Sequence, residues 1–210
     1  MNERGILIVV SGFSGAGKGT LMKRLLKKYE ERYALSVSAT TRQPREGERD
    51  GIEYFFKTKE EFEKMIAKEE LIEYARYVEN YYGTPRAYVE QMLEAGKDVI
   101  LEIEIQGALK VKKAFPDTLL LFVVPPSAEE LKHRLVGRGT ESMEVIESRL
   151  KRAVEESDGM EQYDYLIVND DLEICVEEMH QIICGEHHRS SRNMGFIQQM
   201  KEELKDLKGE

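Results

Sequence analysis

Apolar residues are concentrated in four short runs, separated by longer stretches in which apolar and charged positions recur with a helical spacing. The runs are residues 6–10, 99–105, 119–124 and 165–168, and all are rich in Ile, Leu or Val. Runs of this length without regular polar positions are typical of strands that are covered on both faces. The pattern therefore predicts four buried parallel strands.

The stretches between the runs carry signals for helix starts and stops. A hydroxyl residue followed three positions later by Glu forms a capping box, Thr before Pro marks a helix start, and a lone Gly marks a helix end. Strand and helix signals alternate, which indicates an α/β domain with helices on both faces of a mostly parallel sheet. The capping boxes are Thr58-x-x-Glu61 and Ser127-x-x-Glu130, the Thr-Pro start is Thr84-Pro85, and the stop is Gly96.

Residues 36–78 break this alternation, because they are rich in Tyr, Phe, Thr and short extended runs. We expect them to form a small, partly antiparallel subdomain inserted into the α/β core. No repeat, Pro/Ser-rich linker or low-complexity tract marks another boundary. The chain is thus interpreted as one domain with an insertion and an appended element.

The segment GFSGAGKGT, from Gly12 to Thr20, directly follows the first predicted strand and precedes a helical run at residues 21–29. A phosphate-binding loop needs this context, because its glycines let successive N–H groups point at a phosphate while the helix N-terminus adds its positive end. Lys18 would reach the outer phosphates of a nucleotide. An ordinary Gly-rich turn is the alternative, and the lysine in register favours the phosphate loop.

The residue after Lys18 departs from the general pattern of such loops, which ends in Gly-Lys-Ser/Thr. Gly19 takes that position here, and the hydroxyl comes one residue later, at Thr20. Because the hydroxyl after the lysine binds Mg²⁺ directly in many phosphate-loop proteins, we expect a metal held by nucleotide and water, with no direct protein ligand. The Gly-Lys-Gly-Thr form resembles that of nucleoside monophosphate kinases.

A second anion site is indicated by Thr-Thr-Arg-x-Pro-Arg-x-Gly-Glu at residues 40–48, where Arg42 and Arg45 frame a proline. Guanidinium groups bind phosphate oxygens bidentately, so this pair is suited to a dianionic phosphate. Together with the phosphate loop, the stretch closely resembles the guanylate kinase family. Further blocks match at compatible spacing as far as Asp171, about four fifths of the chain: LIEYA at 71–75, YYGT at 81–84, EIEIQG at 102–107, GRGTE at 137–141 and VNDD at 168–171.

The resemblance implies a P-loop kinase fold, which is an α/β core with a mostly parallel sheet and helices on both faces, a small inserted GMP-binding subdomain and a mobile lid. The guanylate-kinase-like domain would cover residues 1–188, with the core at 1–35 and 85–188, the GMP subdomain at about 36–84 and the lid at about 134–150. Residues 189–210 would form a C-terminal helical tail.

The resemblance also implies roles for individual residues. The ATP-binding residues would be Gly12, Phe13, Ser14, Gly15, Ala16, Gly17, Lys18, Gly19, Thr20, Arg134, Asn169 and Asp170. The GMP-binding residues would be Ser38, Arg42, Arg45, Glu48, Tyr54, Glu73, Tyr82, Thr84, Glu104, Arg138 and Arg149. The catalytic residues would be Lys18, Arg45, Arg138 and Arg149. Two positions depart from the family, since Glu104 stands where members usually carry Asp, and Phe13 where the loop commonly has Pro.

The chemistry of the predicted acceptor residues agrees with guanine. Guanine presents two adjacent donors, N1–H and the 2-amino group, and the single carboxylate of Glu73 can accept both, whereas adenine offers an acceptor at N1. The hydroxyls of Ser38 and Thr84 could donate to guanine O6, and those of Tyr54 and Tyr82 to the phosphate. Core packing in a small sheet is the alternative for either tyrosine.

The implied reaction is in-line transfer of the γ-phosphoryl group of ATP to the phosphate of GMP, with Mg²⁺ as cofactor. Because two anions approach each other, catalysis must supply positive charge and orientation rather than a protein nucleophile. Lys18 and Mg²⁺ would hold the donor, Arg42 and Arg45 the acceptor, and Arg138 and Arg149 the charge that develops between them.

Two other functions stay open at this point. A non-catalytic guanylate-kinase-like module that binds a protein ligand would have the same fold, but Lys18 and the arginines of the lid favour an enzyme. A kinase for another nucleoside monophosphate would share the phosphate loop, but Glu73 with Ser38 and Thr84 favours guanine. Acceptance of dGMP stays open as well. The oligomeric state also stays open, and a homodimer is one of the alternatives.

The net charge limits the partners further. The 210 residues include 31 Lys+Arg and 40 Asp+Glu, a net charge of −9, which argues against a protein that coats nucleic acid. The charge is segregated, since residues 154–188 hold eleven Asp or Glu and no Lys or Arg, whereas residues 1–32 hold seven Lys or Arg and three Asp or Glu. The basic segments are those that the motifs place around ATP and GMP.

The only two cysteines, Cys175 and Cys184, are too few for a disulfide scaffold and indicate a reducing compartment. No apolar stretch approaches the roughly 20 residues that span a bilayer, and the N-terminus lacks the pattern of a signal peptide. We therefore expect a cytoplasmic protein with no membrane partner. A zinc site is not favoured, because the spacing of its candidate ligands matches no standard finger; these are Cys175, His180, Cys184, His187 and His188.

Overall fold

The computed structural model describes residues 4–77, 79–137 and 142–207. The chain divides into two compact units, Met1–Asp170 and Asp171–Glu210. The first unit contains two sheets, and the second contains helices and no strand among its described residues. Helix α7 (Leu172–His187) belongs to the second unit. The sequence analysis instead places the boundary between the domain and the C-terminal tail after residue 188.

The larger sheet of the first unit is parallel, with the strand order β2-β7-β1-β8-β9. Leu7 pairs with Val99 and Ile8 with Leu119, so the first apolar run is the central strand. The strands are β1 (Leu7–Gly12), β2 (Tyr33–Leu35), β7 (Asp98–Glu102), β8 (Leu119–Val124) and β9 (Tyr165–Val168). The mostly parallel sheet predicted from the apolar runs is confirmed.

Three details of this sheet differ from the sequence prediction. Strand β2 was not predicted, because three residues are too few to show a period. Strand β7 ends at Glu102, and the chain turns into α4 (Ile105–Ala114) where the apolar run continues. Strand β9 lies at the edge of the sheet, where Leu166 and Val168 are 51% and 49% exposed, so the expectation that this run is buried on both faces was wrong.

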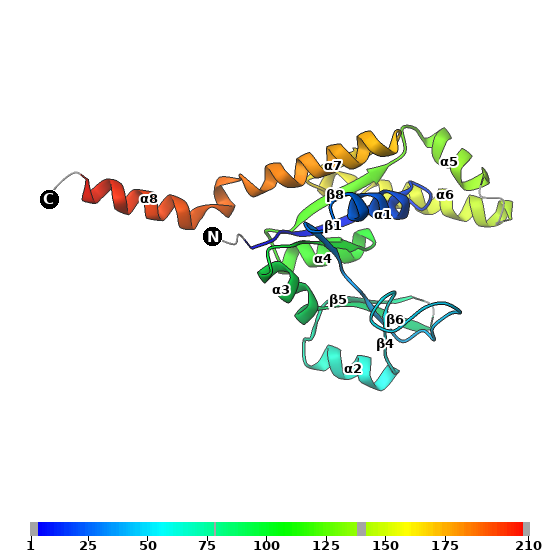
Figure 1. Cartoon of the computed structure of the whole chain (residues 1–210). Helices are drawn as coiled ribbons and strands as arrows, with labels where there is room; N and C mark the ends of the chain where they lie inside the picture. The colour runs from blue at the N-terminus through cyan, green and yellow to red at the C-terminus, as the bar shows by residue number, and fades with distance from the viewer. Residues whose placement is uncertain (1–3, 78, 138–141, 208–210) are drawn as a thin grey trace. The chain divides into compact units, whose positions relative to one another are not determined.

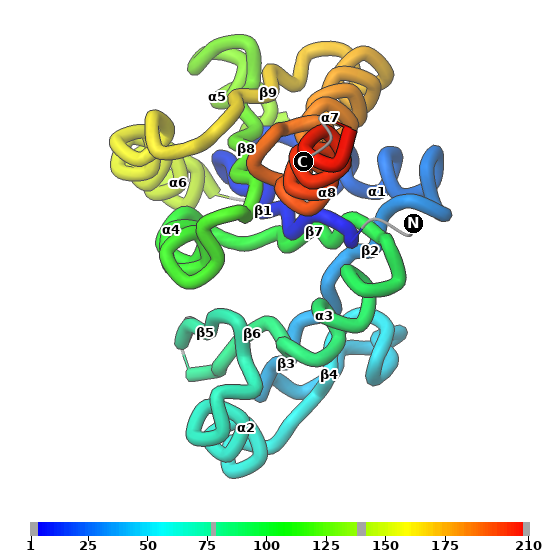
Figure 2. Tube along the Cα trace, turned by 90° about the vertical axis from the view of Figure 1, so that its left-hand side faces the viewer, coloured from blue at the N-terminus to red at the C-terminus, as the bar shows by residue number. Residues whose placement is uncertain are grey.

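Helices cover both faces of the larger sheet. Helix α1 (Lys18–Lys28) carries the chain from β1 to β2, whereas α4 carries it from β7 to β8, in the opposite direction along the sheet. Because crossovers between parallel strands are right-handed, the two helices lie on opposite faces, and Figure 2 shows them on either side of β1. The chain passes from β8 to β9 through α5 (Ala128–Gly137), α6 (Met143–Ser157) and the 3₁₀ turn η1 (Met160–Gln162).

The smaller sheet has the strand order β4-β3-β6-β5, with one parallel pair, β3 and β4, and two antiparallel pairs. Its elements are β3 (Ala39–Thr40), β4 (Phe55–Phe56), α2 (Lys59–Ala67), β5 (Leu71–Tyr77) and β6 (Asn80–Pro85). Ala39, Phe62 and Leu71 form a separate small core. Figure 1 shows these elements apart from the larger sheet, so the inserted, partly antiparallel subdomain is confirmed.

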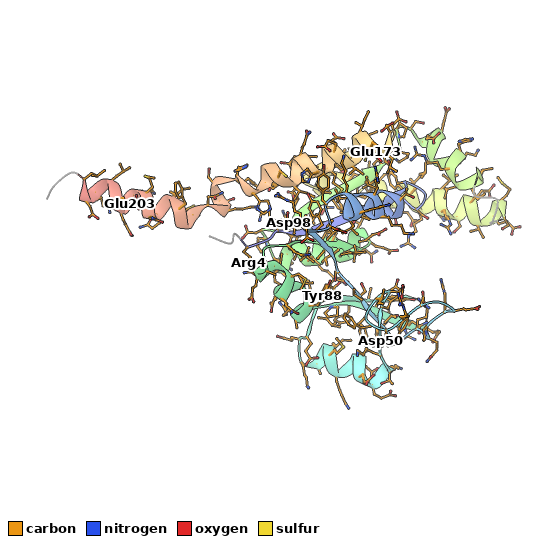
Figure 3. All side chains as sticks on the ribbon, viewed as in Figure 1. Arg4, Asp50, Tyr88, Asp98, Glu173 and Glu203 are labelled. Carbon is orange, nitrogen blue, oxygen red and sulfur yellow. The ribbon has the colours of Figure 1, made fainter. Side chains whose placement is uncertain are left out.

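Helix α3 (Arg86–Glu94) connects the smaller sheet to β7. The hydroxyl of its Tyr88 donates to Leu35 O at the end of β2 (3.3 Å), and its ring centroid lies 6.4 Å from that of Phe55 in β4. Figure 3 labels Tyr88 at this place, on the helix that joins the two sheets. One side chain therefore contacts an edge strand of each sheet.

The helix ends agree with most of the sequence signals. Thr58 Oγ1 accepts from the amide of Glu61 (3.1 Å), and Glu61 Oε2 accepts from the amide of Thr58 (2.7 Å), so the capping box of α2 is complete. At α5 the amide of Glu130 donates to Ser127 Oγ (3.0 Å). Gly96 follows α3 with a φ of 82°, in the left-handed conformation that commonly ends helices.

The expectation that Thr84 caps α3 was wrong. Pro85 is the N-cap residue of this helix, and Thr84 is a buried residue of β6. The reason is that its hydroxyl donates to Glu73 Oε1 on the neighbouring strand (2.8 Å), so it serves the strand pair rather than the helix.

The second unit consists of α7, the 3₁₀ turn η2 (Ser190–Arg192) and α8 (Met194–Asp206). Asp171 caps α7 by accepting from the amide of Ile174 (3.0 Å). Asn193 orders the turn before α8, because its amide group donates to the carbonyls of His187 (2.8 Å) and Arg189 (2.9 Å). Within the described residues of the whole chain, no helix is long and apolar enough to cross a membrane.

Candidate active site

The phosphate loop lies between the end of β1 and the start of α1, as the sequence predicts. Gly12 and Gly17 have φ values of 153° and 90°. A Cβ on Gly12 would lie 2.2 Å from Val123 O, and one on Gly17 would lie 2.4 Å from Asn169 Nδ2. Both positions therefore require glycine, for the backbone torsion and for the close approach of neighbouring atoms.

Lys18 is the first residue of α1, and its ammonium group lies over the loop. Nζ donates to Gly12 O (2.6 Å) and to Phe13 O (3.1 Å). The ammonium charge thus adds to the positive end of the helix dipole at one point. Gly19 and Thr20 follow on the exposed side of the first turn.

Asn169 and Arg134 approach the loop from two other elements. Asn169, which directly follows β9, donates through Nδ2 to Ala16 O (2.8 Å). Arg134 of α5 donates through Nη1 to the same oxygen at the longer distance of 3.5 Å, while its Nε donates to Glu130 (2.6 Å). The end of β9 and α5 are thereby attached to the part of the loop that the family resemblance assigns to ATP.

Arg149 reaches the loop from α6, where its Nη1 donates to Ser14 Oγ (2.6 Å). A cavity of about 680 Å³ opens beside this contact. It is lined by Gly12, Ser14, Lys18, Glu102, Ile103, Glu104, Ile105, Glu144, Val145, Ser148, Arg149, Arg152 and Glu156. The phosphate loop, the end of β7 and the inner side of α6 therefore share one cavity.

Arg42 in the smaller subdomain is held by the carboxylate of Glu48. Nη1 and Nη2 each donate to one oxygen of Glu48 at 2.9 Å, and the guanidinium carbon lies 5.3 Å from the ring centroid of Tyr54. The backbone N–H of Arg45 donates to Glu48 as well (2.7 Å). These hydrogen bonds, first those from Arg42 and then that from Arg45, hold the pKa of Glu48 below its usual value. The hydrogen bonds to Glu48 likewise raise the pKa of Arg42.

Glu73 lies on a bulge of β5. Leu71 pairs with Pro85 and Tyr74 with Gly83, so β5 has one residue more than β6 between these pairs. Such bulges re-aim side chains. Glu73 Oε1 accepts from Thr84 (2.8 Å), and a Cβ on Gly107, in the first turn of α4, would lie 3.5 Å from Glu73 Oε2.

The surroundings of Glu73 also change its acidity. Burial raises the pKa of this carboxyl, and the hydrogen bond from Thr84 opposes the rise only in part. Gly107, which has no side chain, lies beside the second carboxylate oxygen, and the side chain of Ile103 borders the same space. A carboxylate presents two acceptor oxygens, which suit a planar base with adjacent donors.

Tyr54 and Tyr82 lie together near Arg42. Their ring centroids are 6.1 Å apart in an edge-to-face arrangement, and hydrogen bonding with Tyr82 adds to the raised pKa of Arg42. Ser38 is partly buried beside β3, where its carbonyl accepts from the amide of Phe55 (2.9 Å). These residues come from separate segments and meet only in the fold.

Arg138 lies outside the described residues. Arg45 is exposed, and it joins the cluster of Arg42 and Glu48 through its backbone N–H.

The structure brings two further residues to the cavity that the sequence analysis did not single out. Arg152 on α6 donates through Nη2 to Glu104 Oε2 (2.5 Å) and through Nε to Glu156 Oε1 (3.0 Å). Glu102 is the last residue of β7 and pairs in register with Val10, close to the phosphate loop. The spacing of Arg152 three residues after Arg149 is a signal that could have found it, as is the position of Glu102 at the carboxyl end of a strand.

Comparison with known proteins identifies the family of the chain. The family model described as guanylate kinase matches residues 4–186. A guanylate kinase of Bacillus anthracis is 54% identical over 203 residues, which cover 97% of this chain and 99% of that one. A guanylate kinase of Enterococcus faecalis is 51% identical over 204 residues, covering 97% and 100%.

A solved structure shows the same fold. The crystal structure of guanylate kinase from Anaplasma phagocytophilum matches with a TM-score of 0.70 and 34% identity, and the match covers 90% of each chain. The chain belongs to the guanylate kinase family.

Proposed function

We infer that this chain transfers the γ-phosphoryl group of ATP to GMP and produces ADP and GDP. Family membership supplies the reaction class, and the observation that carries the choice of acceptor is Glu73. Glu73 lies on a strand bulge, its Oε1 accepts from Thr84, and its Oε2 lies beside Gly107, which has no side chain. Two adjacent acceptor oxygens suit the N1–H and 2-amino group of guanine.

The phosphate loop holds the donor. Backbone N–H groups of residues 12–20 and the ammonium group of Lys18 take the phosphates of ATP. Asn169 and Arg134, which both donate to Ala16 O, and Asp170, which follows Asn169, take the adenosine. The carbonyls that Lys18 now contacts are exchanged for phosphate oxygens when the nucleotide binds.

The smaller subdomain holds the acceptor. Arg42 and Arg45, with the hydroxyls of Tyr54 and Tyr82, bind the phosphate of GMP, and Glu48 keeps Arg42 in place. The hydroxyl proton of Thr84 is engaged by Glu73, so the donor to guanine O6 is Ser38. Glu104 borders the acceptor from the start of α4.

The transfer itself needs no protein nucleophile. An oxygen of the ionised GMP phosphate attacks the γ-phosphorus, the bond from that phosphorus to the β-bridging oxygen breaks, and ADP leaves with the electron pair. Lys18, Arg149 and Arg138 neutralise the charge that is shared between attacking and leaving oxygens. Because the acceptor is already ionised at neutral pH, no general base is required.

The residues at the loop fit Mg²⁺ as the cofactor. The oxygens of Ser14 and Glu102 line the cavity beside Lys18, and oxygen ligands are those that Mg²⁺ prefers. Because Gly19 stands where many such loops carry a hydroxyl, the ion would be held by phosphate oxygens and by water that Ser14 and Glu102 can bind, and it would neutralise charge on the transferred group.

We place the reaction in the cytoplasm. Both cysteines are free thiols; burial raises the pKa of Cys175 to about 11, so this thiol is unreactive.

A non-catalytic protein-binding module and a kinase for another nucleoside monophosphate are not favoured by the family match or by the intact phosphate loop.

A coupled assay tests the proposal. The purified full chain with ATP and Mg²⁺ is expected to turn over GMP and to discriminate strongly against AMP, IMP and UMP, and dGMP is measured in the same panel. Chelation of Mg²⁺ by EDTA should abolish turnover, and excess Mg²⁺ should restore it. Undetectable GDP formation with Mg²⁺ present would contradict the proposed reaction, and faster turnover of AMP than of GMP would contradict the assigned acceptor.

A further inference from the structure

Helix α6 buries few of its side chains. Of its 15 residues, only Ile146 and Ala153 are buried, and alanine contributes little apolar area. Helices with few buried apolar contacts open easily unless other interactions hold them. The polar contacts of α6 therefore have a larger share in its placement than those of a well-buried helix.

Two of these contacts come from one face of the helix. Arg149 and Arg152 are three residues apart, a spacing that puts their side chains on the same side. Arg149 donates to Ser14 of the phosphate loop, and Arg152 donates to Glu104 at the start of α4. Arg149 thus attaches the helix to the donor side of the cavity, and Arg152 attaches it to the acceptor side.

Arg152 and Glu104 meet where two cavities adjoin. Both residues line the 680 Å³ cavity beside the phosphate loop and also a second cavity of about 300 Å³ beyond it. Glu156, one turn further along α6, accepts from Nε of the same guanidinium group, which fixes the plane of that group. A charge-assisted network of this kind has a defined geometry that a single surface pair lacks.

We propose that Arg152 is a positioning residue that, through its ion pair with Glu104, holds α6 and thereby Arg149 against the phosphate loop. The inference rests on the proposed function, in which Arg149 stabilises charge that develops during transfer. In this role Arg152 acts through Arg149 and not on a substrate, because its guanidinium group is bonded to Glu104 and Glu156. Its removal leaves both nucleotides bound but misplaces Arg149 at the moment when its charge is needed.

Kinetics of Arg152→Gln test the proposal, with Lys151→Gln as the matched control. Lys151 is the exposed neighbour on the same helix, so its substitution removes the same charge from the same segment. Arg152→Gln is expected to lower kcat about three- to fivefold and to leave the KM for ATP within about twofold, because an interaction made only in the transition state acts on kcat. Lys151→Gln is expected to change neither constant.

A double-mutant cycle identifies the partner. In a Glu104→Gln background, Arg152→Gln should have little further effect, and Arg152→Lys in the native background should restore part of the lost kcat, because an ammonium group can still pair with Glu104. An equal effect of Arg152→Gln in both backgrounds would overturn the proposal, as would a loss confined to the KM for ATP.

Hydrogen exchange gives a readout that needs no activity. Backbone amides of α6 should exchange faster in Arg152→Gln than in the native chain or in Lys151→Gln, and equal rates in all three would also overturn the proposal. If the native chain fails to turn over GMP, the proposed function is wrong, and the exchange rates still decide whether Arg152 positions α6.

Discussion

The phosphate loop and the smaller sheet hold their charged groups differently. In the loop, Lys18 and Asn169 donate to main-chain carbonyls of the loop itself. In the smaller sheet the polar side chains contact one another, as Arg42 contacts Glu48 and Thr84 contacts Glu73. The donor side is thus built around a continuous stretch of backbone, whereas the acceptor side is built from pairs of side chains on separate strands and loops.

This difference determines what a substitution leaves behind. Removal of Lys18 leaves two main-chain carbonyls at a loop that borders a cavity, where water can replace the ammonium group, so we expect the fold to lose little. Removal of one member of an acceptor pair leaves the other member without its partner, and a stranded buried group is costly. A substitution at the loop should therefore change activity and leave stability nearly unchanged. A substitution in the smaller sheet should change both.

The largest expected effect is that of Lys18→Ala. The variant should lose a factor on the order of 10²–10³ or more in kcat, because the ammonium group stabilises charge on the transferred phosphoryl group. Its melting temperature should stay within about 2 °C of the native value, since water from the adjoining cavity can replace Nζ at the two loop carbonyls to which it donates. Steady-state kinetics and thermal melting measure the two quantities.

Lys23→Ala is the matched control, because Lys23 is an exposed lysine on the same helix. It should change neither quantity. A Lys18→Ala variant that keeps native kcat would show that the loop does not hold the donor phosphates.

The same contrast explains how much of the molecule could be predicted from sequence. The loop, its flanking strand and the capping box at Thr58 depend on neighbouring residues, so their pattern can be recognised in the chain. Thr84 was misplaced because its partner, Glu73, lies on another strand, eleven positions earlier. The bulge that aims Glu73 depends on the register of two strands, which no local pattern reveals.

Arg152 illustrates a second limit. A charged residue on an exposed helix is usually solvated, and only its three-residue spacing from Arg149 distinguishes Arg152 from Lys151. Its partner, Glu104, lies 48 positions away. The family resemblance supplied Glu104 as part of a matched motif, but it gave no indication that a residue outside those motifs would contact it.

Glu73→Gln should have the next largest effect, on selectivity. An amide presents one acceptor oxygen and one donor group, so it cannot accept both donors of guanine. The ratio of kcat/KM for GMP to that for AMP should fall about tenfold to hundredfold. Glu70→Gln, at an exposed position of the same subdomain, is the control and should leave the ratio unchanged. Unaltered discrimination in Glu73→Gln would remove this residue from the base site.

Glu48→Gln should have a smaller effect, confined to the acceptor. The amide replaces one of the two oxygens that now fix the guanidinium group of Arg42, so this group is held at one point instead of two. The KM for GMP should rise about two- to fivefold with the KM for ATP unchanged, because the pair is partly exposed. A rise in both constants would show that the two sides of the site are not held independently.

The smallest effects concern stability and pH, where Glu48 and Glu73 should act in opposite directions. The pKa of Glu48 is lowered in the fold, so its contribution to stability is present above the unfolded pKa and is lost as pH falls through the folded one. The pKa of Glu73 is raised by burial, so the native state binds more protons than the unfolded state, and stability is lost as pH rises through the folded pKa.

Melting temperatures of the unliganded proteins between pH 4 and pH 8 test this contrast. Relative to the native chain, Glu73→Gln should gain stability as the pH rises, because the glutamine carries no charge to bury and its carbonyl can still accept from Thr84. Glu48→Gln should lose its stability deficit as the pH falls, since the native carboxylate is then protonated as well. Parallel curves for the two variants would contradict the opposite pKa directions. A gain in Glu73→Gln at neutral pH, combined with its loss of selectivity, would mean that the fold tolerates a destabilising carboxylate at the position where guanine needs one.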